Sequence, residues 1–189
     1  MAISYNRHKF DVDQYLRIAA AGALLERRTE LIDGAIVDVT PQGPLHASLV
    51  ARLSRTFSER VGPHAIIWAQ LPIALRPRSM PEPDIALLRP REDYYAAIEV
   101  TPQDVLLVVE VASASLRFDR SIKARLYAAY TILDYWIIDA ERRAIGIHRS
   151  PSDGAYKSVT WISEGTLTPL ALPDIRLEVA EIFSHLCAR

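Results

Sequence analysis

The sequence predicts a single mixed α/β domain over residues 1–189, in which an antiparallel meander leads into a partly parallel β-sheet flanked by helices. The chain has 189 residues, 50% of them hydrophobic and 24% charged, which is typical of one globular domain with a substantial core. A strand, a helix and a second strand follow one another over residues 105–139. That order is typical of a crossover between parallel strands.

The first third of the sequence contains two predicted helices with a hairpin between them. Residues 11–27 carry apolar side chains at helical spacing after Asp11, a residue type that caps helix N-termini. In residues 30–39, two short apolar runs flank an Asp-Gly dipeptide, which favours a turn because Gly accepts positive φ. Residues 45–60 carry large apolar side chains at four-residue steps, so we expect an amphipathic helix that begins near His46.

The rest of the sequence is richer in strands. The most apolar run, residues 105–111, is interrupted only by Glu110, which suits a central strand covered on both faces. Helices are expected over residues 119–130 and 178–186. The other predicted strands span residues 65–69, 72–76, 84–88, 135–139, 144–148 and 156–162.

Charge and cysteine content exclude some classes of protein. The formal net charge is −1, so a polyanion would have to be bound through local basic patches and bound cations. A single cysteine, Cys187, excludes an intramolecular disulfide and a cysteine-based zinc site. No apolar run reaches the length of a signal peptide or a membrane span. We therefore expect a cytoplasmic protein with no membrane partner.

Two acidic residues lie in apolar surroundings. Glu110 interrupts a hydrocarbon-rich strand, which is costly unless a cation or another partner compensates its charge; the alternative is that it meets solvent or an arginine at the end of the strand. Asp84 follows a proline at the start of another strand, where a simple turn aspartate is the alternative. Together they match the needs of Mg²⁺, or of Mn²⁺ in its place, and the carbonyl of Val111 is a further candidate ligand.

The segment after this strand is the most basic short stretch of the chain. On a helix, Asp119, Lys123 and Tyr127 would share one face, because they are four residues apart. Asp119 is interpreted as an N-cap or first-turn acid. Lys123 either pairs with Asp119 on the surface or lies beside a metal ion and orients the attacking water. The candidates for nucleic-acid phosphate contacts, with a solvated helix face as the alternative, are Arg117, Arg120 and Arg125.

Several short motifs follow one another along the chain. They are Glu-Leu-Ile-Asp-Gly (Glu30 to Gly34), the helix-opening His46, Pro83-Asp84, Val-Val-Glu-Val-x-Ser (Val108 to Ser113), Asp-Arg-x-x-Lys with a later tyrosine (Asp119, Arg120, Lys123, Tyr127) and Tyr-Trp-Ile-x-Asp (Tyr135 to Asp139). Their order and spacing resemble the PD-(D/E)XK nuclease superfamily and, more closely, the Uma-type family of bacterial restriction endonucleases.

This resemblance implies a restriction-endonuclease-like core, a mixed β-sheet flanked by helices. It also implies that Asp84 and Glu110 are metal ligands and that Lys123 is the catalytic lysine. The usual lysine of the superfamily lies two residues after the acid, where this chain has Ala112. The resemblance suggests that the following helix supplies the lysine instead.

Two further residues are candidates for the catalytic site. Glu30 precedes a strand and is similar to an N-terminal acid that approaches the ion in several nucleases of this superfamily; an edge-strand charge is the alternative. His46 is a candidate for supporting the metal site or contacting phosphate, and a helix cap or a packing residue is the alternative.

The leading functional hypothesis is Mg²⁺-dependent hydrolysis of DNA phosphodiester bonds. One alternative is a domain on a nuclease fold that binds nucleic acid or a protein without cleaving. Another is a metal-dependent phosphoesterase that acts on something other than DNA. A homodimer would suit cleavage of both strands of a duplex, because a two-fold protein matches duplex pseudo-symmetry.

Overall fold

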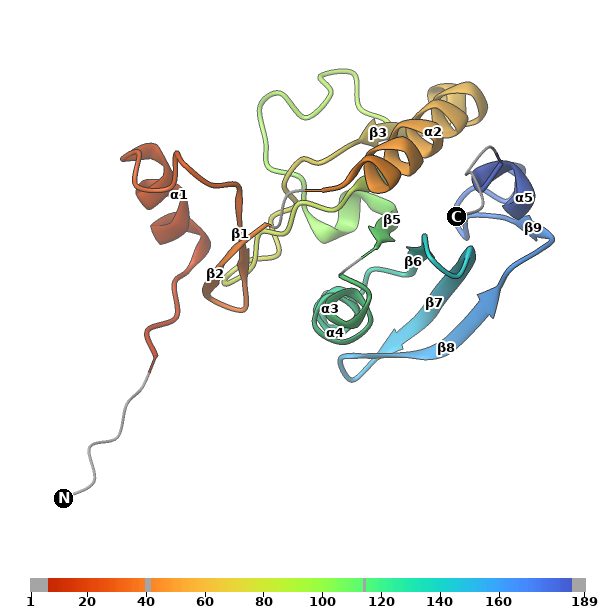
Figure 1. Cartoon of the computed structure of the whole chain (residues 1–189). Coiled ribbons are helices and arrows are strands. Elements are labelled where there is room, and N and C mark those ends of the chain that lie inside the picture. Colours follow the sequence, from red (N-terminus) through yellow and green to blue (C-terminus); the bar gives the residue numbers. More distant parts are fainter. Residues whose placement is uncertain (1–6, 40–41, 114, 185–189) are drawn as a thin grey trace.

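A six-stranded mixed β-sheet forms the centre of the protein (Figure 1). The computed structural model describes residues 7–39, 42–113 and 115–184. β5 and β6 are parallel and every other neighbouring pair is antiparallel, which confirms the predicted crossover. In their order across the sheet, the strands are β3 (Ile66–Trp68), β4 (Ile85–Leu88), β5 (Val105–Ala112), β6 (Asp134–Asp139), β7 (Ala144–Ser152) and β8 (Ala155–Ile162).

Helices cover both faces of this sheet (Figure 1). On one face lies α2 (Pro44–Val61), which leads through a 3₁₀ turn, η1 (Gly62–His64), into β3. The crossover between β5 and β6 carries a continuous helical segment on the other face. This segment consists of α3 (Leu116–Phe118), the π-helical turn η3 (Asp119–Lys123) and α4 (Ala124–Ala129).

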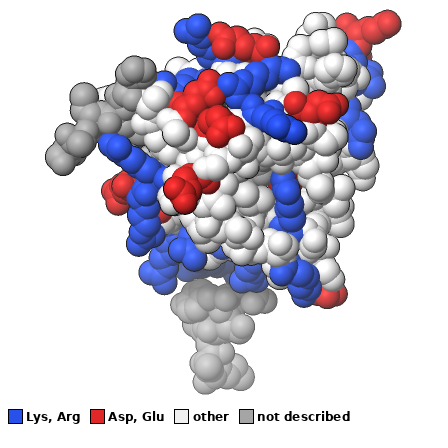
Figure 2. Space-filling model, turned by 90° about the vertical axis from the view of Figure 1, so that its right-hand side faces the viewer, with Lys and Arg blue, Asp and Glu red and all other residues white. Residues whose placement is uncertain are grey.

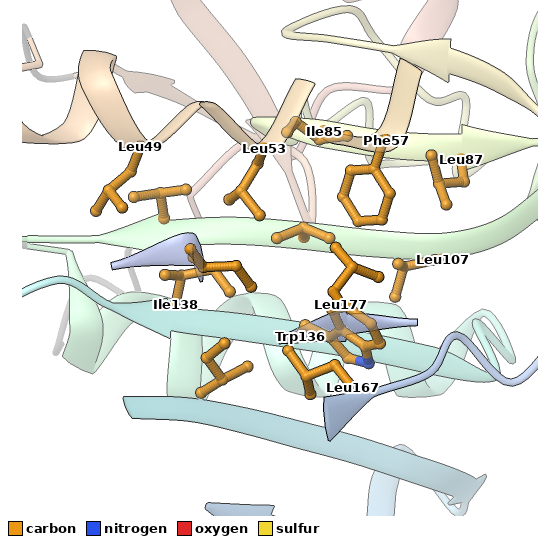
Figure 3. Close-up of a cluster of buried hydrophobic side chains, with 14 of the residues drawn as sticks. Leu49, Leu53, Phe57, Ile85, Leu87, Leu107, Trp136, Ile138, Leu167 and Leu177 are labelled. Atoms are coloured by element: carbon orange, nitrogen blue, oxygen red, sulfur yellow. The ribbon is translucent and has the colours of Figure 1, made fainter. Parts of the chain in front are cut away.

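The core under α2 follows from the periodicity of this helix. Leu49, Leu53 and Phe57 recur at four-residue steps and therefore share one face of the helix. All three are fully buried and pack against β4, β5 and β6; Figure 3 shows Leu53 and Phe57 next to Ile85, with Trp136 below them. Their spacing confirms the predicted amphipathic helix.

A second core lies on the opposite face of the sheet. Val108 and Ala112 of β5 pack there with Ala124 and Tyr127 of α4. Successive side chains of a strand point to opposite faces, so Glu110, between Val108 and Ala112, also faces α4. The position of Glu110 under the crossover helix is therefore a consequence of strand alternation.

The N-terminal segment forms a small lobe beside the sheet (Figure 1). Its elements are α1 (Val12–Ala20), β1 (Thr29–Ile32) and β2 (Ala35–Asp38), and the two strands form the predicted hairpin. Asp11 caps α1, since its side chain accepts a hydrogen bond from the amide of Gln14 at 2.7 Å. The helix ends earlier than the predicted range of 11–27, because the chain turns at Gly22, whose φ is +80°.

Near the C-terminus, a two-stranded sheet and a short helix close the α2 face. These elements are β9 (Thr166–Leu167), β10 (Leu177–Glu178) and α5 (Val179–Ile182). The predicted helix over 178–186 is therefore shorter in the structure, and its last two residues lie outside the described residues. In the part of the chain that the structure describes, no helix has the length and apolar character needed to cross a membrane.

Two predictions about local structure are wrong. Residues 72–76 form no strand, because their amides bond to scattered partners, such as the carbonyls of Pro81 and Val100, and Leu75 pairs only with nearby Ser79. The helix predicted to start at Asp119 begins at Leu116 instead. Asp119 is therefore an interior helix residue and not an N-cap.

Candidate active site

A cavity of about 370 Å³ lies beside the C-terminal part of β5. Its lining includes five buried charged residues, each no more than 8% exposed. They come from the hairpin strand β1, the residue before β4, the strand β5 and the π-helical turn η3. These residues are Glu30, Asp84, Glu110, Asp119 and Lys123. The fold thus brings together side chains from four separate segments of the sequence.

Asp84 and Glu110 are held next to each other by reciprocal backbone contacts. The amide of Val111 donates to Asp84 Oδ2 at 2.9 Å, and the amide of Asp84 lies 3.4 Å from Glu110 Oε2. Their adjacency follows from the antiparallel register of β4 and β5, in which Ile85 pairs with Val109. The amide of Val111 contacts Asp84, whereas a role for its carbonyl as a metal ligand stays a prediction.

The ammonium group of Lys123 lies between two acids, one from β5 and one from β1. Its Nζ donates to Glu110 Oε1 at 2.8 Å and to Glu30 Oε1 at 3.2 Å. The hydroxyl of Tyr127, one helical turn later, donates to the same Glu110 oxygen at 2.9 Å. Because Lys123 is only 6% exposed, the alternative of a surface pair with Asp119 is wrong.

The helix, and not β5, delivers the lysine to the acids. Ala112 faces the same side of the sheet as Glu110 and is packed against α4 in the second core. The ammonium group of Lys123 nevertheless lies 2.8 Å from Glu110, because the crossover helix covers this face. A lysine two residues after the acid is therefore not needed to place a cation beside Glu110.

The helix is loosely wound where it meets the cavity. In η3 the amide of Ala124 bonds to the carbonyl of Asp119, five residues earlier, and such π turns are frequent at functional sites. Asp119, Lys123 and Tyr127 are all buried, which confirms that they share one face. The carboxylate of Asp119 accepts a hydrogen bond from Ser115 Oγ at 2.6 Å.

Negative charge exceeds positive charge among these buried groups. Burial raises the pKa of Glu110; Lys123 opposes the rise, while Asp84, Asp119 and Glu30 reinforce it. Burial likewise raises the pKa of the Asp119 carboxyl. For Lys123, burial lowers the pKa, but the carboxylates of Glu110 and Glu30 outweigh burial, so the net shift is upward. The lysine is therefore a permanent cation beside more acids than it can balance.

His46 supports Asp84 from the other side. It is 1% exposed, and its Nε2 lies 2.9 Å from Asp84 Oδ2, so that the ring N–H donates to the carboxylate. Gly43, and not His46, is the N-cap residue of α2. The side-chain amide of Gln70 lies 3.4 Å from the other oxygen, Asp84 Oδ1. His46 therefore fixes the orientation of one acid in the cavity.

The oxygen atoms at this site fit a divalent cation. Among the described residues, Asp84 Oδ1 and Glu110 Oε2 have hydrogen-bond donors no closer than 3.4 Å, which leaves them lone pairs for a ligand. Within the same residues, no group of three or more His, Cys, Asp or Glu side chains is arranged to hold a metal. Mg²⁺ commonly takes one or two protein carboxylates and completes its shell with water and phosphate oxygens, so the two acids suffice.

The basic residues predicted to contact nucleic acid lie outside the cavity. Arg117, Arg120 and Arg125 are exposed on the crossover helix. Arg120 lies over the ring of Trp161 in β8, with its guanidinium carbon 5.1 Å from the ring centroid. Figure 2 shows basic side chains gathered at the lower end of one face of the molecule. Contact of these arginines with DNA stays a prediction.

Sequence reasoning missed two residues that line cavities here. Gln70 approaches Asp84 from an irregular loop, and no periodic pattern precedes it. Phe118 lines the same cavity as the acids, although its apolar character suggests only core packing. The available signal for Phe118 was its position directly before Asp119.

Comparisons with known proteins give the family and the fold of this chain. The model of the Uma2 family, whose description is "Putative restriction endonuclease", matches residues 12–180. A crystal structure of "a putative nuclease belonging to DUF820" from Anabaena variabilis ATCC 29413 superposes with a TM-score of 0.73 at 18% sequence identity, over 93% of this chain and 98% of that chain. No curated protein matches the chain. The structural likeness confirms the restriction-endonuclease-like fold.

Proposed function

This chain belongs to the Uma2 family, described as "Putative restriction endonuclease", and from that premise we propose that it is a Mg²⁺-dependent endonuclease that hydrolyses DNA phosphodiester bonds. One observation carries the proposal. Asp84, Glu110 and Lys123, which come from three separate segments, converge in one cavity with more buried acid than the lysine balances. A bound divalent cation would correct that imbalance, and a phosphodiester is a substrate that such a cation activates.

Asp84 and Glu110 are the side chains that would hold Mg²⁺, or Mn²⁺ in its place, with the carbonyl of Val111 as a candidate third ligand. Bound there, the ion would polarise the scissile phosphate and lower the pKa of the attacking water. His46 and Tyr127 keep the two carboxylates in position through their hydrogen bonds. Such partners of metal ligands fix their orientation and tune their basicity.

Lys123 supplies a fixed positive charge at the reacting phosphate. Its ammonium is held by Glu110 and Glu30, so it reaches the cavity without a conformational search. It orients the attacking water by donating a hydrogen bond and offsets the negative charge that develops on the phosphate. The exposed arginines of the crossover helix would contact flanking phosphates, which positions DNA without reading its sequence.

Cleavage of DNA substrates in Mg²⁺ or Mn²⁺ tests this function. We expect Asp84→Asn, Glu110→Gln and Lys123→Met each to lower the cleavage rate by roughly a hundredfold or more, the scale of losing one preorganised charge at a transition state. Glu59→Gln, at an exposed acid of α2 that pairs with Arg55, is the control and keeps full activity. Undiminished cleavage by either acid variant contradicts the mechanism.

Calorimetry with Mg²⁺ separates this function from its alternatives. Cation binding that is lost in Asp84→Asn and Glu110→Gln supports the metal site independently of any substrate. Binding without cleavage of any DNA points to a domain that binds but does not cleave. Hydrolysis of small phosphate esters with no action on DNA would instead identify a phosphoesterase of a different specificity.

A further inference from the structure

Three apolar side chains line the acidic cavity. Phe118 lines it from the crossover helix, and Val37 and Val39 line it from the hairpin and the loop that follows β2. All three side chains are half-buried. Among the described residues, none of the three belongs to a hydrophobic core cluster or packs against one. These side chains therefore serve the cavity and not the packing of the fold.

Phe118 is distinctive among the aromatic residues near the site. Tyr127 and Tyr135 contact each other inside the second core, with ring centroids 5.0 Å apart and the ring planes tilted by 57°. Within the described ranges, Phe118 makes no such ring contact. It directly precedes Asp119 and lines the cavity together with Glu110 and Lys123. An aromatic ring thus lies beside a site suited to a phosphate.

We propose that this cavity receives one unpaired nucleotide of a DNA strand, with its phosphate at Lys123 and at a cation held by Asp84 and Glu110, and with its base stacked on Phe118. The identity of the polymer as DNA rests on the proposed function, and the inference adds the class of substrate: an unpaired strand in preference to an intact duplex. Val37 and Val39 form the apolar side of the same compartment.

The chemistry of nucleic acids favours this occupant. In a duplex the faces of the bases are stacked on one another, and only their edges and the backbone reach a protein. An aromatic side chain can stack on a base only when that base is unpaired or splayed out. The cavity of about 370 Å³ is at the small end of the range for sites that enclose one small molecule, roughly 300–1,000 Å³. One nucleotide fits within that volume, whereas a duplex is too wide to enter the cavity.

A neighbouring cavity gives the strand room to continue. It has a volume of about 820 Å³ and shares Arg28, Asp38, Val39 and Gln42 with the first cavity. Arg27 also lines it and pairs with Asp38, and Arg28 pairs with Glu82, so each guanidinium could contact a flanking phosphate beside its acid partner. Two adjoining cavities with arginines and apolar side chains in their lining offer a path for a single strand.

Fluorescence anisotropy tests the inference without requiring cleavage. The probes are a labelled single-stranded DNA and a blunt hairpin duplex of the same length. Both are measured in Ca²⁺, which binds the same kind of oxygen ligands as Mg²⁺, with strand integrity checked on gels. We expect the single strand to bind at least tenfold more tightly than the duplex. Phe118→Ala should weaken single-strand binding by about tenfold, the scale of losing one stacked base, and leave duplex binding unchanged.

Three variants keep this experiment decisive. Phe118→Trp should retain single-strand binding because it keeps an aromatic face, whereas Phe118→Leu should lose it although it preserves an apolar side chain. Tyr94→Ala, at an exposed aromatic residue that lines neither cavity, is the matched control and should bind normally. Equal affinity for both probes, no binding to either, or equal losses on both in Phe118→Ala would overturn the inference. Single-strand binding that depends on Phe118, with no hydrolysis in Mg²⁺, would instead count against the proposed function.

Discussion

Two buried acids on adjacent parallel strands have very different surroundings. Asp134, at the start of β6, is fully buried, and its carboxylate accepts hydrogen bonds from Arg149 at 2.8 and 3.1 Å. The indole of Trp136 and the amide of Leu170 add two more, at 2.9 and 2.8 Å. One guanidinium balances one carboxylate, and neither cavity of the site reaches Asp134.

Glu110, near the end of β5, has a different environment. It shares its cavity with three other buried acids and a lysine, and among the described residues the nearest hydrogen-bond donor to its Oε2 is 3.4 Å away. Burial raises the pKa of this carboxyl. An enclosed acid whose charge is neutralised by a neighbouring guanidinium therefore stabilises the fold, whereas an acid that faces a cavity and lacks a matching cation is available to a ligand.

Removing the enclosed acid should have the largest effect on stability. We expect Asp134→Ala to lower the free energy of unfolding by about 3–5 kcal/mol, because the buried indole of Trp136 loses its acceptor and the half-buried Arg149 loses its ion-pair partner. Glu110→Gln should cost far less in metal-free buffer, because a neutral amide avoids the desolvation of a buried carboxylate. Urea unfolding of both variants measures the contrast. Equal losses in the two would show that both acids are structural.

We expect the second largest effect from the loss of the Tyr127 hydroxyl, which should weaken metal binding and nothing else. In Tyr127→Phe the hydrogen bond to Glu110 Oε1 disappears, and removal of such a partner typically lowers metal affinity by roughly 10–100-fold. Calorimetric titration with Mg²⁺ measures the change. Tyr156→Phe is the matched control, since its hydroxyl donates to the carbonyl of Ile132 away from the cavity, and it should bind Mg²⁺ normally. A similar loss in both variants would refute a specific role for Tyr127.

The smallest effect should come from His148, a buried base that has no acid partner among the described residues. Burial among the rings of Tyr135, Tyr156 and Trp161 lowers the pKa of His148 below 6.5. The unfolded chain therefore binds a proton first as the pH falls through about 6.5, and this residue's contribution to stability declines until the folded protein is protonated as well. Above that range its contribution is fully present.

Urea unfolding of the wild type and His148→Phe at pH 7.5 and 5.5 checks this. The wild type should lose more stability than the variant on acidification. The comparison between the two proteins cancels the opposite contributions of Glu110 and Asp119, whose raised pKa values favour the folded state at lower pH. An identical pH dependence in the two proteins would contradict the prediction.

Much of the candidate site could be located from local patterns. Asp84 after a proline, Glu110 in an apolar run and Lys123 one turn after Asp119 are each visible as departures from their surroundings. The contact of Glu30 with Lys123 could not be read in this way, because it joins residues 93 positions apart. Phe118 was missed because an apolar residue in a helix has no mark that separates a cavity wall from a core.

The sequence by itself determined the strands of the six-stranded sheet, the main helices and their order, because hydrophobic periodicity and turn residues act over a few neighbouring positions. It also determined that Glu110 and Ala112 face one side of a strand. Only the tertiary structure decided that the crossover helix covers that side, so that Lys123 reaches Glu110 where Ala112 cannot. It also decided that residues 72–76 form no strand. The physical reason is that both outcomes depend on contacts between distant segments, which local propensity does not encode.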